Sequence, residues 1–130
     1  MAIDFVQPLV RVLLCTVATL FGLLTIGAGS RVMLGADPGY VVYQPLLLYN
    51  TVMGLGYLAT AFIGWRSSIH GRNGAASIFG LNLLVLAGVF LLYSFGADIA
   101  VDSLHAMTLR TVVWLALLFG FWWLARKTPN

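Results

Sequence analysis

Four long apolar runs, separated by short polar segments, take up most of this 130-residue chain. They lie at about residues 5–28, 45–65, 75–96 and 104–125. A helix needs about 20 apolar residues to cross the roughly 30 Å hydrocarbon core of a bilayer, and each run has about that length. Backbone polar groups in lipid must be satisfied within the protein, so these spans are expected to be helices.

The composition agrees with a membrane location. The chain is 61% hydrophobic and 8% charged, whereas soluble domains carry about 25% charged residues. A water-soluble domain of this size could not cover so much apolar surface. The connections are short, so consecutive helices should be antiparallel neighbours. We therefore predict an all-α, integral membrane four-helix bundle with up-down-up-down order, formed by residues 1–130 as a single domain.

The charges between the runs sort by sign. Basic residues gather in the second gap and the C-terminal tail, and acidic residues lie in the first and third gaps. Because Lys and Arg are enriched on the cytoplasmic side, we predict that both termini are cytoplasmic, in a bacterial-type inner membrane. The same flanking explains the net charge of +3, so no nucleic-acid partner is expected. The basic residues are Arg66, Arg72, Arg126 and Lys127, and the acidic ones are Asp37, Asp98 and Asp102.

Helix ends and helix contacts follow from local residue types. We expect Arg66 to Gly74 to form a polar connection between two helices, in which Gly71 and Gly74 are stop signals for a helix. We also expect Asp102 or Ser103 to cap the fourth helix. Small residues permit close helix approach in lipid, so they mark the expected contacts. These residues are Gly56, Thr60 and Gly64 in the second span, Gly80 and Gly88 in the third, and Ala116 and Gly120 in the fourth.

Three polar side chains inside the apolar runs are predicted to take part in helix packing: Arg11, Asn50 and Asn82. Arg11 either reaches back to the lipid headgroups through its long stem or faces the bundle on the same side as Cys15 and Thr19. Asn50 and Asn82 should form interhelical hydrogen bonds. By depth, the two asparagines are expected to be too far apart for direct contact.

A charged cluster is expected on the extracytoplasmic side, and its members are the candidate ligand-binding residues. In one interpretation the cluster is an ion-pair network, with Asp98 or Asp102 as the partner of Arg110. In the other it binds an anionic ligand or a quinone headgroup, with Arg110 and His105 as donors. The candidates are Arg31, Asp98, Asp102, His105 and Arg110, and Asp37 lies on the same side.

Several chemistries are disfavoured. A single cysteine, Cys15, excludes an intramolecular disulfide and a C-x-x-C redox pair. His70 and His105 fall on opposite sides of the predicted membrane, so they cannot ligate one haem together. We predict no metal site and no catalytic residue, because His, Cys and carboxylates do not cluster and no nucleophile–base spacing is recognisable. The absence of glutamate also disfavours small proton-coupled exporters with an embedded Glu.

The layout resembles DoxX-like small membrane proteins. The shared segments are Pro8-Leu9-Val10-Arg11, the Asp37-Pro38 turn, Met53-Gly54-Leu55-Gly56 and Trp65-Arg66. The resemblance implies a four-helix membrane fold and, for some members, a link to quinone-dependent sulfur oxidation. Asn50 is the nearest polar group where the family has an acidic residue at the start of its second helix, so no catalytic residue is carried over.

We therefore predict a subunit or accessory of a larger membrane assembly, without autonomous catalysis. Its expected partners are the lipid bilayer and either other membrane subunits or further copies of the chain. One alternative is a redox accessory that binds a quinone or another lipophilic ligand at the extracytoplasmic side, with quinone or lipid as the cofactor. A second alternative is a small transporter or channel.

Overall fold

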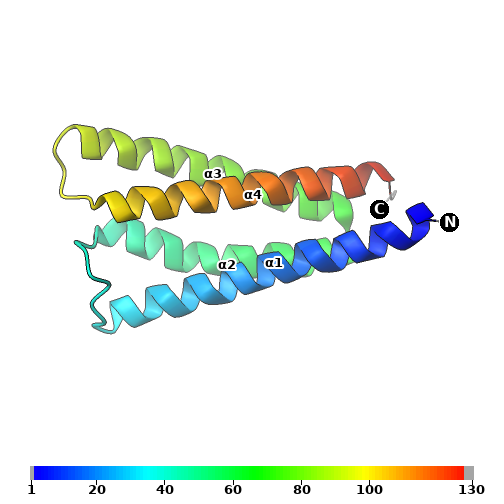
Figure 1. The fold of residues 1–130 in the computed structure, drawn as a ribbon, viewed down its shortest axis with the longest axis horizontal. Helices are drawn as coiled ribbons and strands as arrows, with labels where there is room; N and C mark the ends of the chain where they lie inside the picture. Colours follow the sequence, from blue (N-terminus) through cyan, green and yellow to red (C-terminus); the bar gives the residue numbers. More distant parts are fainter. Residues whose placement is uncertain (1, 128–130) are drawn as a thin grey trace.

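The computed structural model describes residues 2–127, which form four helices. These are α1 (Ala2–Met33), α2 (Gln44–Arg66), α3 (Ser68–Ser94) and α4 (Val101–Lys127). They run antiparallel in chain order (Figure 1). The prediction of an all-α, up-down-up-down bundle is confirmed for this part of the chain.

The two ends of the bundle differ in what they carry. One, here called the terminus end, holds the start of α1, the end of α4 and the junction between α2 and α3 (Figure 1). The other, the loop end, holds the connections 34–43 and 95–100. α1 packs against α2 and α4, and α3 packs against the same two helices. The basic residues of the second gap and tail therefore lie opposite the acidic residues of the first and third gaps, as predicted.

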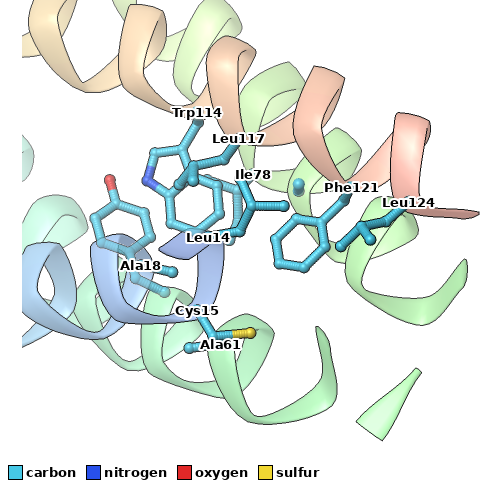
Figure 2. Packing of buried hydrophobic residues seen from close by; sticks show 11 residues of the cluster. Leu14, Cys15, Ala18, Ala61, Ile78, Trp114, Leu117, Phe121 and Leu124 are labelled. Carbon is cyan, nitrogen blue, oxygen red and sulfur yellow. The ribbon is translucent and has the colours of Figure 1, made fainter. Parts of the chain in front are cut away.

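All four helices are long and apolar enough to cross a membrane, which indicates a multi-pass membrane protein. Large apolar side chains point outward, including Leu24 and Leu84, each 71% exposed. The interior is built around aromatic residues. Trp114 and Phe121 of α4 are fully buried and pack with Leu14 of α1 and Ile78 of α3 in one cluster (Figure 2).

The predicted polar connection over residues 66–74 is wrong. α2 ends at Arg66 and α3 begins at Ser68, so Ser67 alone joins them. Ser67 caps α3 by accepting a hydrogen bond from the backbone N–H of His70 at 3.4 Å. Gly71 and Gly74 thus lie inside α3, which begins seven residues before the predicted start at residue 75.

The glycines at this junction allow close approach instead of stopping a helix. A Cβ on Gly71 would lie 2.7 Å from the Cα of Gly64, and one on Gly64 would lie 2.6 Å from the ring of Phe121. No side chain fits at such distances without movement of the neighbouring groups. The two glycines therefore permit α2 and α3 to begin their antiparallel packing directly after a one-residue connection.

The predicted small-residue contacts are correct in part. Thr60 and Gly64 are buried, and a Cβ on Gly120 would lie 2.5 Å from Leu14. In contrast, a Cβ on Gly80 or Gly88 would meet nothing within 4 Å. Gly80 and Gly88 are therefore not close contacts within the bundle, and the close approaches of α3 lie instead at Gly71 and Gly74.

Two further expectations about small and polar residues need correction. Gly56 and Ala116 are not close contacts: Gly56 is half-buried, with only Met53 near it, and Ala116 is exposed. Asp102 and Ser103 do not cap α4, since α4 begins at Val101 and both residues lie in its first turn.

Candidate ligand-binding site

A cavity of about 100 Å³ lies at the loop end between α1, α2, α4 and the connection 34–43. We call it the loop-end cavity. In Figure 1 the ribbons of α1 and α4 separate toward this end. The polar part of its lining consists of Thr25, Tyr40, Tyr43, Asn50, Ser103 and Arg110.

Arg110 brings a cation to this cavity from within α4. It lies nine residues after the first residue of the helix, about 13 Å along the axis at 1.5 Å per residue. Its Nη1 donates to the Thr25 hydroxyl of α1 at 3.0 Å. The guanidinium also lies 5.8 Å from the centre of the Phe21 ring, within cation–π range. Its Nε is buried and has no hydrogen-bond partner among the described residues.

Asn50 contributes the opposite kind of group from α2. Its Oδ1 is buried and lacks a hydrogen-bond donor in the described part of the chain. Buried polar atoms are almost always paired, so each exception requires an explanation. Here one buried donor and one buried acceptor belong to two side chains that line the same cavity.

A separate polar network lies deeper in the bundle. The Tyr49 hydroxyl donates to Asn82 Oδ1 at 2.8 Å, and Asn82 Nδ2 donates to the Tyr57 hydroxyl at 3.3 Å. Asn82 of α3 thus forms hydrogen bonds with two tyrosines of α2. Asn82 is fully buried. Because α3 begins at Ser68, Asn82 lies near the middle of this helix, whereas the predicted span placed it nearer the helix start.

Aromatic rings connect this network to the arginine. Tyr57 packs against Trp114 with ring centres 4.8 Å apart, and against Phe21 at 5.6 Å. Phe21 in turn faces Arg110. Phe21 thus contacts both Arg110 and a member of the deeper network, Tyr57.

The structure separates the five residues predicted as a ligand site. Arg110 lines the loop-end cavity, whereas Arg31 lines a neighbouring hollow of about 240 Å³ together with Asp37. Asp98, Asp102 and His105 are exposed and line neither hollow.

The expected ion pair of Arg110 with Asp98 or Asp102 is wrong. The guanidinium contacts Thr25 and Phe21 of α1 instead. Asp102 is eight residues earlier in the same helix, about 12 Å along the axis, and Asp98 is farther away in the loop. Arg110 therefore lies too deep in the bundle to reach these exposed carboxylates.

Arg11 is held inside the protein at the terminus end. Its Nη1 donates to the carbonyl of Gly64 at 2.8 Å and to that of Trp65 at 3.4 Å, and its Nη2 donates to the Ser68 hydroxyl at 2.6 Å. The last carbonyl groups of a helix lack hydrogen-bond donors within the helix, and at the end of α2 Arg11 is such a donor. Arg11 therefore faces the bundle instead of reaching back to the headgroups.

Thr25, Tyr40, Tyr43 and Ser103 line the cavity but were not predicted from the sequence. Thr25 is 85 residues from Arg110, and only the antiparallel packing of α1 and α4 brings them together. Their similar depth was the signal available in the sequence: Thr25 lies eight positions before the last residue of α1, and Arg110 nine positions after the first residue of α4.

The described residues contain no group of three or more His, Cys, Asp or Glu side chains that could hold a metal ion. The chemistry of the cavity is instead that of hydrogen bonding and one positive charge. Comparisons with family models, curated proteins and solved structures found no match for this chain. The DoxX-like resemblance accordingly stays a prediction from the sequence.

Proposed function

We propose that this protein binds the polar headgroup of a membrane-soluble molecule in the loop-end cavity, with Arg110 as the principal donor. One observation carries the proposal: Arg110 and Asn50 both line this cavity, and each has a buried atom, Nε and Oδ1 respectively, without a hydrogen-bond partner among the described residues. A ligand that accepts from the first atom and donates to the second satisfies both.

The energetics favour an occupied site. Leaving a buried donor or acceptor without a partner costs about 1–3 kcal/mol, and more for a charged group. An arginine inside a membrane span is also costly, and such residues commonly mark functional sites. Binding a ligand at Arg110 and Asn50 would recover part of both costs.

The size of the cavity limits what enters it. Pockets for drug-sized ligands have volumes of about 300–1,000 Å³, and the loop-end cavity has about 100 Å³. A headgroup fits, while the rest of the molecule has to lie among the lipid chains. We propose a binding and positioning role, as in an accessory of a membrane assembly, with a lipid or a quinone as the class of ligand.

A second candidate function is that of a subunit, and a separate observation favours it. Gly80 and Gly88 lie eight residues apart on α3 and have open space where a Cβ would be. In lipid, small residues allow another helix to pack closely. The double variant Gly80→Leu/Gly88→Leu should then lose a complex seen by native electrophoresis while keeping its helix content; an unchanged complex would refute this candidate.

We also propose that both termini face the cytoplasm of a bacterial-type cell. The sorting of basic residues to the terminus end supports this orientation. Arg126 lies 5.0 Å from the Trp122 ring centre there, a pairing suited to the headgroup region. In a Cys15→Ala background, a cysteine at Asp98 should react with an impermeant maleimide in intact cells, and one at Arg72 only after lysis. The reverse pattern would overturn the orientation.

The ligand proposal is tested by purifying the protein in a mild detergent, extracting it with organic solvent and identifying co-purified molecules by mass spectrometry. We expect one lipophilic species near 1:1 stoichiometry in the wild type and its loss in Arg110→Gln. Arg72→Gln is the matched control, since it removes an arginine at the other end of the bundle. Equal recovery from all three proteins would contradict the proposal.

A further inference from the structure

We infer that the headgroup bound in the loop-end cavity is a singly protonated phosphate, as in a phosphate monoester lipid. This inference rests on the proposed function and specifies the chemical class of its ligand. It follows from three properties of the cavity: its charge, its pair of unsatisfied atoms and its volume.

The charge favours an anion. Among the described residues that line the cavity, Arg110 alone has a charged side chain. Its described contacts are a hydroxyl and an aromatic ring, neither of which neutralises a guanidinium. A nearby opposite charge strongly stabilises a charged group in a low-dielectric site. A neutral quinone or a neutral glyceride supplies hydrogen-bond acceptors but leaves this cation uncompensated.

The two unsatisfied atoms distinguish between anions. Arg110 Nε needs an acceptor, and Asn50 Oδ1 needs a donor. An ionised carboxylate has acceptors only. A phosphate monoester loses its second proton with a pKa of about 6, so its singly charged form has acceptor oxygens and one P–O–H donor. That form alone, among these anions, complements both atoms at once.

The cavity volume and its remaining polar groups agree with this assignment. The cavity volume of about 100 Å³ is well below the roughly 300–1,000 Å³ of pockets for drug-sized ligands. A compact tetrahedral group suits that space. Tyr40, Tyr43 and Ser103 also line the cavity, and the hydroxyl group of each residue type is able to donate to a phosphate oxygen.

Titrations followed by native mass spectrometry, in a neutral detergent near pH 6, test the inference. The probes are lysophosphatidic acid, oleate, inorganic phosphate, monoolein and a decyl-substituted quinone. The proteins are the wild type, Arg110→Gln and Asn50→Leu. Arg31→Gln is the control, because it removes an exposed arginine at the same end. Circular dichroism and thermal melting establish that each variant folds.

We expect lysophosphatidic acid to bind the wild type most tightly, with affinity about tenfold or more lower in Arg110→Gln. Asn50→Leu should abolish the preference for lysophosphatidic acid over oleate while keeping both above monoolein. Arg31→Gln should bind like the wild type. If Arg110→Gln fails to fold, the change of preference in Asn50→Leu decides alone.

Other results overturn specific parts of the account. Quinone or monoolein binding that equals phosphate binding and depends on Arg110 would refute the phosphate inference and leave the proposed function standing. Inorganic phosphate binding as tightly as the lipid would uphold the headgroup chemistry and refute a membrane-soluble source. Absence of binding by all five probes would refute both, and an equal loss in Arg31→Gln would assign the effect to surface charge.

Discussion

Arg110 of α4 donates a 3.0 Å hydrogen bond to the hydroxyl of Thr25, which joins α4 to α1 beside the loop-end cavity. This bond fixes one nitrogen of the guanidinium, and Nε has no partner within residues 2–127. The side chain is therefore positioned by α1 while part of its hydrogen-bonding capacity remains for a ligand.

Replacing Thr25 by valine should destabilise the protein by about 1.5–3 kcal/mol, the range for a hydrogen bond to a charged group. Valine keeps the shape of threonine and removes the hydroxyl acceptor. Denaturant unfolding in micelles, followed by circular dichroism, measures the change. Thr25→Ser is the control, because it keeps the hydroxyl and should lose less. If valine and serine gave the same stability, the bond would have no role in holding Arg110.

Replacing Arg11 by methionine should lower the free energy of unfolding by about 2 kcal/mol. The variant removes donors from the final carbonyls of α2, Gly64 and Trp65. Arg11→Lys should fall between wild type and Arg11→Met, because an ammonium donates from a single nitrogen and cannot span the carbonyls and Ser68 together. Detergent-based equilibrium unfolding measures all three proteins. A methionine variant as stable as the wild type would show that Arg11 serves only as an anchor in the headgroups.

Gly71→Ala and Gly80→Ala should differ although both add one methyl group to α3. At Gly71 the new Cβ would meet backbone at 2.7 Å, so we expect a loss of about 1–3 kcal/mol. At Gly80 it meets nothing within 4 Å, and alanine favours helix over glycine by up to about 1 kcal/mol. Melting temperatures of the two variants measure the contrast. Equal effects would contradict the close α2–α3 packing.

The hydrogen bond between Tyr49 and Asn82 should appear as coupling in a double-mutant cycle. Tyr49→Phe and Asn82→Leu each break the 2.8 Å bond, so the double variant should lose less than the sum of the two. The expected coupling is about 0.6–2 kcal/mol, as for interhelical bonds in lipid. The coupling energy is calculated from the unfolding free energies of the wild type, the two single variants and the double variant. Strict additivity would show that the bond contributes nothing to stability.

Much of the fold was predictable from the sequence because lipid imposes simple rules. Apolar run lengths correctly predicted four helices, and charge sorting correctly separated the two ends of the bundle. The start of α3 was missed because Arg72, Gly71 and Gly74 are typical of a loop. Tertiary packing overrides that local signal: the missing side chains of Gly64 and Gly71 allow α2 and α3 to meet after one residue.

The candidate site was predictable in part. Arg110 could be singled out because a cation that far inside an apolar helix needs a partner. Its partner could not be found by topology, since nearness along the chain favoured Asp98 and Asp102, whereas α1 contributes Thr25 from 85 residues away. The place of Asn50 beside Arg110 likewise depends on how α1, α2 and α4 meet, which run lengths and charges do not determine.

The central claim is that Arg110 and Asn50 share a bound headgroup. A density map of the loop-end cavity, from the protein in lipid nanodiscs, tests it most directly. We expect tetrahedral non-protein density within hydrogen-bond distance of Arg110 Nε and Asn50 Oδ1, continuing as a chain into the lipid. A map in which these two atoms bond to each other, or to water alone, would contradict it.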